Sequence, residues 1–146
     1  MASPDFFIKK MDGILCLIQD YWKLNMMTMK NAYLLSLIPD ILNKVSEAKE
    51  KYFTKLYVWW GYNNIRIKEG DKWKAAYWTN QGLFEPLVVF FGLTNSLVMF
   101  QMMMNDIFRE LIDKGVVVIY MDDILIFGGQ TKEEHHTIVV WYHASI

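Results

Sequence analysis

Apolar residues along the chain occur in short runs separated by polar turns, and most runs have the length of a β-strand. Residues 6–10 and 14–20 form the first two runs, and Asp12-Gly13 between them favours a hairpin turn. The pattern predicts further strands at residues 52–58, 65–67, 73–79, 84–90, 116–120 and 124–127.

Three segments have helical features instead. Pro39 suits the first position of a helix that ends near residues 47–50. Thr94 or Asn95 is a suitable N-cap for a second, and Thr131-Lys132-Glu133-Glu134 has the form of a capping box that begins a third. The second helix has one apolar face, made of Leu97, Phe100, Met104, Ile107 or Phe108, and Leu111. Strands and helices do not alternate regularly, so the predicted fold class is α+β.

Composition limits the classes of protein that fit. The 146 residues are 53% hydrophobic and the net charge is −1, which excludes a disordered chain. Charge is nevertheless uneven: residues 1–75 carry a balance of +4 and residues 76–146 a balance of −5. A basic half beside an acidic half fits a surface for phosphate next to a site for cations, and uneven surface composition explains it equally well.

Location and partners are only partly indicated. The single Cys16 favours an intracellular protein, and the first residues do not form a signal peptide. No run of 18 apolar residues exists, so we expect no membrane association. Oligomeric state is unknown from the sequence.

The segment with the clearest chemistry is Tyr120-Met121-Asp122-Asp123, which lies between two apolar runs. Adjacent carboxylates repel each other and are stabilised by a cation, and Mg²⁺ prefers such hard oxygen ligands. A solvated acidic turn is the alternative, because Asp is common in turns. A buried strand pair with two acids at its tip favours the metal-binding interpretation.

This segment resembles the metal motif of reverse transcriptases, and other blocks resemble gypsy-class retrotransposons in order and spacing. The resemblance covers about residues 5–139. The matching blocks are Phe7-Ile8-Lys9-Lys10, Asp12-Gly13, Gln19-Asp20-Tyr21, Lys23-Leu24-Asn25, Gly61-Tyr62-Asn63-Asn64-Ile65-Arg66-Ile67, Phe91-Gly92-Leu93-Thr94-Asn95-Ser96, Phe100-Gln101 and Met104-Asn105-Asp106-Ile107-Phe108-Arg109.

The resemblance implies the fingers and palm of a right-hand polymerase. It implies fingers at about residues 1–51 and 68–93, and a palm at about 52–67 and 94–146. Family members continue into a thumb, so the chain is expected to be a fragment with the thumb missing.

The resemblance also implies RNA-directed DNA synthesis from deoxynucleoside triphosphates, on an RNA or DNA template with a primer. Two Mg²⁺ ions carry that reaction, and three aspartates hold them. Asp122 and Asp123 match two of the three, whereas the third position is Tyr57. Tyrosine is neutral near pH 7 and presents one oxygen in place of a bridging carboxylate. We therefore predict an inactive copy.

Further positions match the family's nucleotide site. Lys9 or Lys10 matches the lysine that meets the triphosphate, and Tyr62 matches the residue that rejects a 2′-hydroxyl. A solvated lysine and an ordinary buried tyrosine are the structural alternatives. Phe91 and Gly92 match the pocket floor, and Cys16 stands where the family has an arginine.

Other departures suggest a degenerate copy. Tryptophan, cysteine or histidine replaces the usual arginine at Trp22, Trp59, Trp78, Cys16 and His136. One C-to-T base change explains each of these, so we hypothesise cytosine deamination of a silenced element; Tyr57 does not fit that change. Two rivals remain: a non-catalytic module that binds nucleic acid or protein, and an active enzyme in which another acid supplies the missing ligand.

Overall fold

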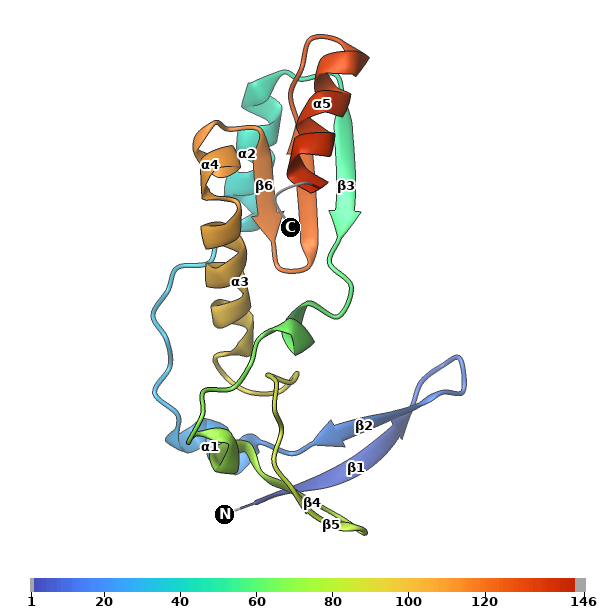
Figure 1. Ribbon diagram of the computed structural model, residues 1–146, viewed down its shortest axis with the longest axis vertical. Helices are drawn as coiled ribbons and strands as arrows, with labels where there is room; N and C mark the ends of the chain where they lie inside the picture. Colours follow the sequence, from blue (N-terminus) through green and yellow to red (C-terminus); the bar gives the residue numbers. More distant parts are fainter. Residues whose placement is uncertain (1, 144–146) are drawn as a thin grey trace. The chain divides into compact units, whose positions relative to one another are not determined.

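A computed structural model describes residues 2–143 of the chain, with side chains through residue 141. The chain divides into two compact units, residues 1–31 with 62–96 (unit 1) and residues 32–61 with 97–146 (unit 2). Each unit has its own β-sheet (Figure 1).

Unit 1 contains a four-stranded sheet in the order β2-β1-β4-β5. The strands are β1 (Ser3–Lys9), β2 (Leu15–Gln19), β4 (Tyr77–Thr79) and β5 (Gly82–Phe84). The pair β1 and β2 forms the predicted hairpin; Gly13 at its tip has a φ of 85°, which glycine adopts without strain. A short helix, α1 (Trp22–Met27), follows β2 and was not predicted.

Three predicted strands of unit 1 are wrong in their extent. The run at 73–79 begins as a 3₁₀ turn, η2 (Lys72–Ala75), and only β4 is extended. The run at 84–90 leaves the sheet after Phe84, and the run at 65–67 contributes a single bridge, Arg66 to Val88. Apolar content alone predicted strands here, because it cannot distinguish a strand from an irregular apolar loop.

Unit 2 contains an antiparallel sheet in the order β3-β7-β6. The strands are β3 (Phe53–Tyr57), β6 (Val117–Tyr120) and β7 (Asp123–Phe127), close to the predicted runs. Its helices are α2 (Ile38–Ala48), α3 (Ser96–Ile107), α4 (Arg109–Asp113) and α5 (Lys132–His143). Figure 1 shows α3 and α4 running beside β6.

The helices of unit 2 follow the sequence signals closely. Pro39 lies at the start of α2, as predicted. The capping box also forms, because Thr131 Oγ1 accepts a hydrogen bond from Glu134 N and the Glu134 carboxylate accepts one from Thr131 N. The predicted second helix is interrupted at Phe108, which separates α3 from α4.

The core of unit 2 lies where β7, the central strand, meets the helices. Ile124 and Ile126 of β7 and Phe100 of α3 are fully buried, as is Val117 of β6. This core fixes the β6–β7 hairpin, whose tip carries the two adjacent aspartates.

Candidate active site

The tip of the β6–β7 hairpin is a two-residue turn made of Met121 and Asp122. Tyr120 pairs with Asp123 across the turn. Met121 has a φ of 54°, a left-handed conformation that hairpin turns usually give to glycine or asparagine. The turn is therefore strained and needs support from its surroundings.

That support comes from Gln101 of α3, whose side chain is almost fully buried. Its Oε1 accepts a hydrogen bond from Met121 N at 2.8 Å. Its Nε2 donates to Ile119 O at 3.1 Å and to Asn105 Oδ1 at 2.9 Å. Gln101 thus holds the end of β6 and the first residue of the turn, which orients the two aspartates that follow.

Asp122 is held from the other side by β3. Its carbonyl oxygen accepts a hydrogen bond from Val58 N at 2.9 Å. Its Oδ1 atom is buried and, among the described residues, has no hydrogen-bond partner. Burial, and secondarily the charge of Asp123, raises the pKa of the Asp122 carboxyl. A carboxylate in this position is stabilised by a nearby cation.

Gly61 provides the space beside Asp122. A Cβ atom at this residue would lie 2.8 Å from Asp122 Oδ1 and 2.5 Å from Cζ of Phe100. Both distances are shorter than van der Waals contact, and Phe100 is fully buried and has no room to move. The close approach explains why glycine occupies this position.

Asp123 faces the exposed side of β3. Tyr57 is its register partner on that strand, and the Tyr57 side chain is 65% exposed. Lys55 lies two residues before Tyr57 on the same face of β3, and its Nζ is 3.0 Å from Asp123 Oδ1. The hairpin therefore brings together two carboxylates, an ammonium group and a phenol.

This donor set fits one divalent cation better than two. Mg²⁺ commonly takes one or two carboxylates and completes its shell with water, and the orphaned Oδ1 of Asp122 is a suitable ligand. A pair of ions needs a further bridging carboxylate. Within residues 2–143, no three Asp, Glu, His or Cys side chains are grouped to hold a metal.

The predicted nucleotide-site residues of unit 1 fall into two places. Tyr62 is buried and its ring centroid lies 4.4 Å from that of Phe91, which is exposed. Gly92 follows with a φ of 98°. Asn25 holds this segment, because its Nδ2 donates to Gly92 O at 2.6 Å and its Oδ1 accepts from Thr94 N at 2.8 Å.

The remaining predicted residues lie on the β1–β2 hairpin. Lys9 ends β1 and Lys10 begins the turn, and both side chains are exposed. Cys16 lies on β2 opposite Ile8, with a free thiol. The structure does not bring either lysine against Tyr62 or Phe91 through any contact within unit 1.

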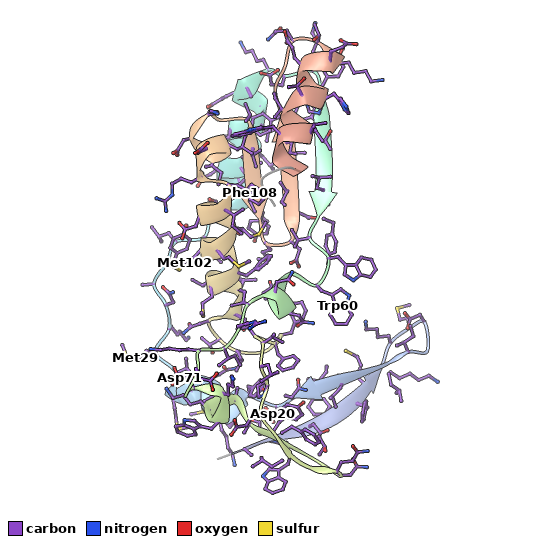
Figure 2. All side chains as sticks on the ribbon, viewed as in Figure 1. Asp20, Met29, Trp60, Asp71, Met102 and Phe108 are labelled. Carbon is purple, nitrogen blue, oxygen red and sulfur yellow. The ribbon has the colours of Figure 1, made fainter. Side chains whose placement is uncertain are left out.

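An exposed aromatic run begins at the last residue of β3 and continues beyond it. Tyr57, Trp59 and Trp60 are 65%, 76% and 63% exposed. Trp60 has a φ of 57°, so the backbone is held in a left-handed turn, and Figure 2 shows its indole pointing away from the ribbon. These rings offer flat apolar surfaces to solvent.

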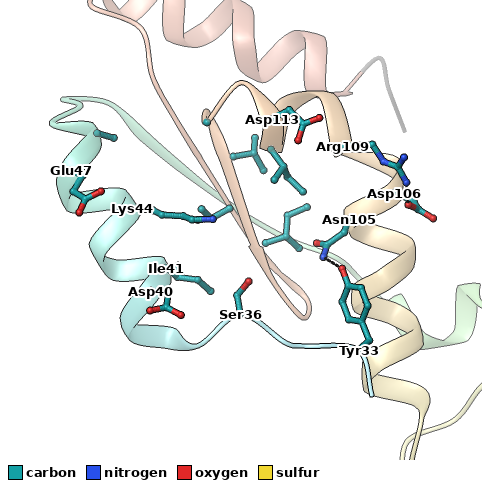
Figure 3. Close-up of a pocket in the computed structure, with 16 residues that line it drawn as sticks. Tyr33, Ser36, Asp40, Ile41, Lys44, Glu47, Asn105, Asp106, Arg109 and Asp113 are labelled. Atoms are coloured by element: carbon teal, nitrogen blue, oxygen red, sulfur yellow. Dashed lines mark hydrogen bonds and ion pairs between the residues drawn. The ribbon is translucent and has the colours of Figure 1, made fainter. Parts of the chain in front are cut away.

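A separate cavity of about 850 Å³ lies in unit 2 between α2, α3–α4 and β6 (Figure 3). Asn105 and Tyr33 both line the cavity, and Asn105 Nδ2 donates a hydrogen bond to the Tyr33 hydroxyl. Neither aspartate of the turn lines it. The acidic turn and this cavity are therefore distinct features of the unit.

Sequence reasoning missed the roles of three residues. Gln101 and Asn25 belong to matching blocks, but a buried clamp cannot be inferred from residue type alone. Tyr21 is the third: it is buried, its hydroxyl donates to Ala75 O at 2.9 Å, and burial, with Tyr77 second, raises its pKa to about 12. For Gln101 and Asn25, a polar residue beside consecutive methionines was the available signal; Tyr21 follows Gln19-Asp20 and had no such signal.

The family described as "Reverse transcriptase (RNA-dependent DNA polymerase)" matches residues 8–143, so the chain belongs to the reverse transcriptase family. The Transposon Tf2-3 and Tf2-7 polyproteins of Schizosaccharomyces pombe (strain 972 / ATCC 24843) are each 37% identical to it over 134 residues. Each alignment covers 92% of this chain and 10% of the polyprotein, so the chain spans about a tenth of the curated relatives' length.

Solved structures confirm the predicted α+β fold with fingers and palm. The foamy viral protease-reverse transcriptase in complex with an RNA/DNA hybrid has a TM-score of 0.85 and 20% identity, covering 99% of this chain and 19% of that one. A second foamy viral structure, in complex with double-stranded DNA, has a TM-score of 0.81 and 19% identity, with 99% and 25% covered. Over the part of the chain that the structure describes, no helix is long and apolar enough to cross a membrane.

Proposed function

We propose that this chain is the reverse transcriptase domain of a gypsy-class retrotransposon, and that this copy is catalytically inactive. The family reaction is RNA-directed DNA synthesis from deoxynucleoside triphosphates on a primed RNA or DNA template. As the predicted division we keep fingers at about residues 1–51 and 68–93 and palm at about 52–67 and 94–146. An intracellular location follows from this assignment as part of the proposal.

The observation that carries the proposed inactivity is the pairing of Tyr57 with Asp123. A phenol there presents a single hydroxyl oxygen and cannot bridge two cations as a third carboxylate would. Bound Mg²⁺ would supply electrostatic stabilisation of the charge that develops during nucleotidyl transfer. Asp122 and Asp123 would hold such an ion, and without the third ligand we expect a rate loss of several orders of magnitude.

For the incoming nucleotide, we propose roles for the unit 1 residues that match the family. Lys9 or Lys10 would contact the triphosphate through an ammonium group on the exposed hairpin. Tyr62 would pack under the sugar and reject a 2′-hydroxyl, and Phe91 and Gly92 would form the floor of the pocket, where glycine allows close approach of the backbone. Cys16, in place of an arginine, removes one phosphate contact.

The test is Mg²⁺-dependent primer extension by the natural chain beside its Tyr57→Asp variant. We expect extension only by the variant, and Tyr57→Phe as a control should remain inactive. Mn²⁺ binding should be measured in parallel, and we expect the variant to bind two ions and the natural chain at most one. Primer extension by the natural chain at a rate within tenfold of the variant would overturn the proposed inactivity. That result would favour a ligand from another acidic residue.

A second candidate function is a non-catalytic nucleic-acid binding module. The exposed run of Tyr57, Trp59 and Trp60 favours it, because nucleobases stack on exposed aromatic rings. Trp59→Ala with Trp60→Ala should then weaken binding of a fluorescent single-stranded RNA roughly tenfold or more. Trp141→Ala, another exposed tryptophan of unit 2, is the matched control.

The origin of the copy is tested in genomic DNA. If cytosine deamination on one strand or the other produced Trp22, Trp59, Trp78, Cys16 and His136, related copies carry the original C, or the G that pairs with it, at the changed base of those codons. Related copies that share the same codons would contradict this origin.

A further inference from the structure

Lys55 occupies an unusual position for an exposed lysine. It lies on the same face of β3 as Tyr57, and its ammonium group is 3.0 Å from Asp123 Oδ1. The two side chains are 65% and 51% exposed, so both can reach water instead. The negative charge of the turn therefore attracts the ammonium group to Asp123, since burial does not force the two groups together.

The charges that face this point come from the ends of β3 and β7 and from the turn. Asp122 and Asp123 contribute two negative charges and Lys55 contributes one positive charge. Tyr57, the register partner of Asp123 on β3, carries a phenol and not a carboxylate. With a carboxylate in place of Tyr57, three negative charges would face the one ammonium group of Lys55. In this chain the ammonium group faces two negative charges and neutralises half of them.

We propose that the ammonium of Lys55 acts as an internal counter-ion that occupies the place of a divalent cation at the Asp122–Asp123 turn. The inference rests on the proposed function, since it concerns the same two carboxylates. A divalent ion that takes Asp123 Oδ1 as a ligand must displace Lys55 from that oxygen, and an ion on the other oxygen of Asp123 still meets the repulsion of the ammonium. The chain thus contains a tethered competitor for metal, and loss of the third carboxylate shifts the competition toward the lysine.

The size of the effect follows from Coulomb's law. One unit charge beside a divalent ion, a few ångströms away in a water-exposed site, changes ion affinity by roughly tenfold at low salt. Salt screens exposed charges, so at high ionic strength the change should fall to about twofold. A purely structural role for Lys55 would not depend on salt in this way.

The experiment is a titration with Mn²⁺ alone, in which electron paramagnetic resonance reports the free ion. Lys55→Met retains the aliphatic stem and removes the charge, and we expect it to bind Mn²⁺ about tenfold more tightly than the natural chain. Lys55→Arg should bind as weakly as the natural chain. Lys51→Met, at an exposed lysine of unit 2 outside any described ion pair, controls for net charge.

The outcomes separate this inference from the proposed function. Equal Mn²⁺ affinity of Lys55→Met and the natural chain would overturn the inference, and so would an equal gain in Lys51→Met. If Lys55→Met gave no gain in Mn²⁺ affinity but Tyr57→Asp bound a second ion, the inference about Lys55 would fail and the proposed function would stand. Tight binding of two ions by the natural chain would overturn both. The Lys55 side chain is exposed, so its variants should remain folded, and far-ultraviolet circular dichroism checks this.

Discussion

The two units of the chain bury their strands to different degrees. In unit 2, Ile124 and Ile126 of the central strand are fully buried between the neighbouring strands and the helices. In unit 1, three consecutive residues of β1, Phe6, Phe7 and Ile8, are each more than 45% exposed, although they are equally apolar. Both faces of that hairpin therefore contact solvent within the unit.

This difference shows which region determines the geometry of the acidic turn. A strand fixed by a close-packed core gives its end a defined direction, and the turn after β6 is further held by Gln101 and Val58. The β1–β2 hairpin has backbone hydrogen bonds but little core, so its lysines have more conformational freedom. The four predictions below test this contrast.

The largest expected effect is on the core of unit 2. Ile124→Ala should lower the free energy of unfolding by about 3 kcal/mol, because it leaves a cavity beside fully buried neighbours. Ile8→Ala in β1 should cost less than about 1 kcal/mol, since much of that side chain is already in water. Urea unfolding measures both. Equal losses would show that the units do not differ in packing.

A smaller effect is expected at Gly61, where the space beside Asp122 is tested. Gly61→Ala should cost about 2 kcal/mol, because the added methyl overlaps Phe100 and the Asp122 carboxylate. Combining it with Phe100→Leu should recover part of that loss in a double-mutant cycle followed by thermal unfolding. Strict additivity of the two losses would mean that Phe100 is not the obstacle.

The clamp on the strained turn gives the third prediction. Gln101→Met should cost roughly 1–2 kcal/mol, because Met121 N and Ile119 O each lose a hydrogen-bond partner. Amide hydrogen exchange at Met121 should accelerate more than exchange at Val118, which pairs within the sheet. Gln130→Met, at an exposed glutamine of unit 2, should leave stability within about 0.5 kcal/mol. An unchanged exchange rate of the Met121 amide would contradict the role of Gln101 in holding the turn.

The smallest effect concerns pH and the charge of Asp122. Its pKa is raised in the folded chain by burial and by Asp123, so folding favours the protonated form. The loss of folding stability that comes from ionising this carboxyl is absent below pH 3.8, the group's ordinary pKa. It develops as the pH rises through the pKa of the group in the folded chain. In metal-free buffer, Asp122→Asn should therefore stabilise the chain at pH 7, by less than about 1 kcal/mol because solvent screens this partly exposed group, and have no effect at pH 3. Destabilisation at pH 7 would contradict the assigned environment.

Local signals predicted unit 2 well. Proline at a helix start, a capping box and apolar runs on either side of two aspartates each specify structure within a few residues. All of them appear in α2, α5 and the β6–β7 hairpin. Unit 1 was harder to predict because its apolar segments at 73–79 and 84–90 are irregular over most of their length, and hydrophobicity alone does not report backbone conformation.

By itself, the sequence determined the family, the α+β class and the identity of the residues at the acidic turn, because these depend on residue types and their spacing. Tertiary structure alone decided which neighbours those residues meet. Gln101 reaches Met121 from another element, and the orphaned oxygen of Asp122 depends on the close approach of Gly61 and Phe100. Lys55 reaches Asp123 only because β3 and β7 pair in one register, and register is set by the packing of the whole sheet.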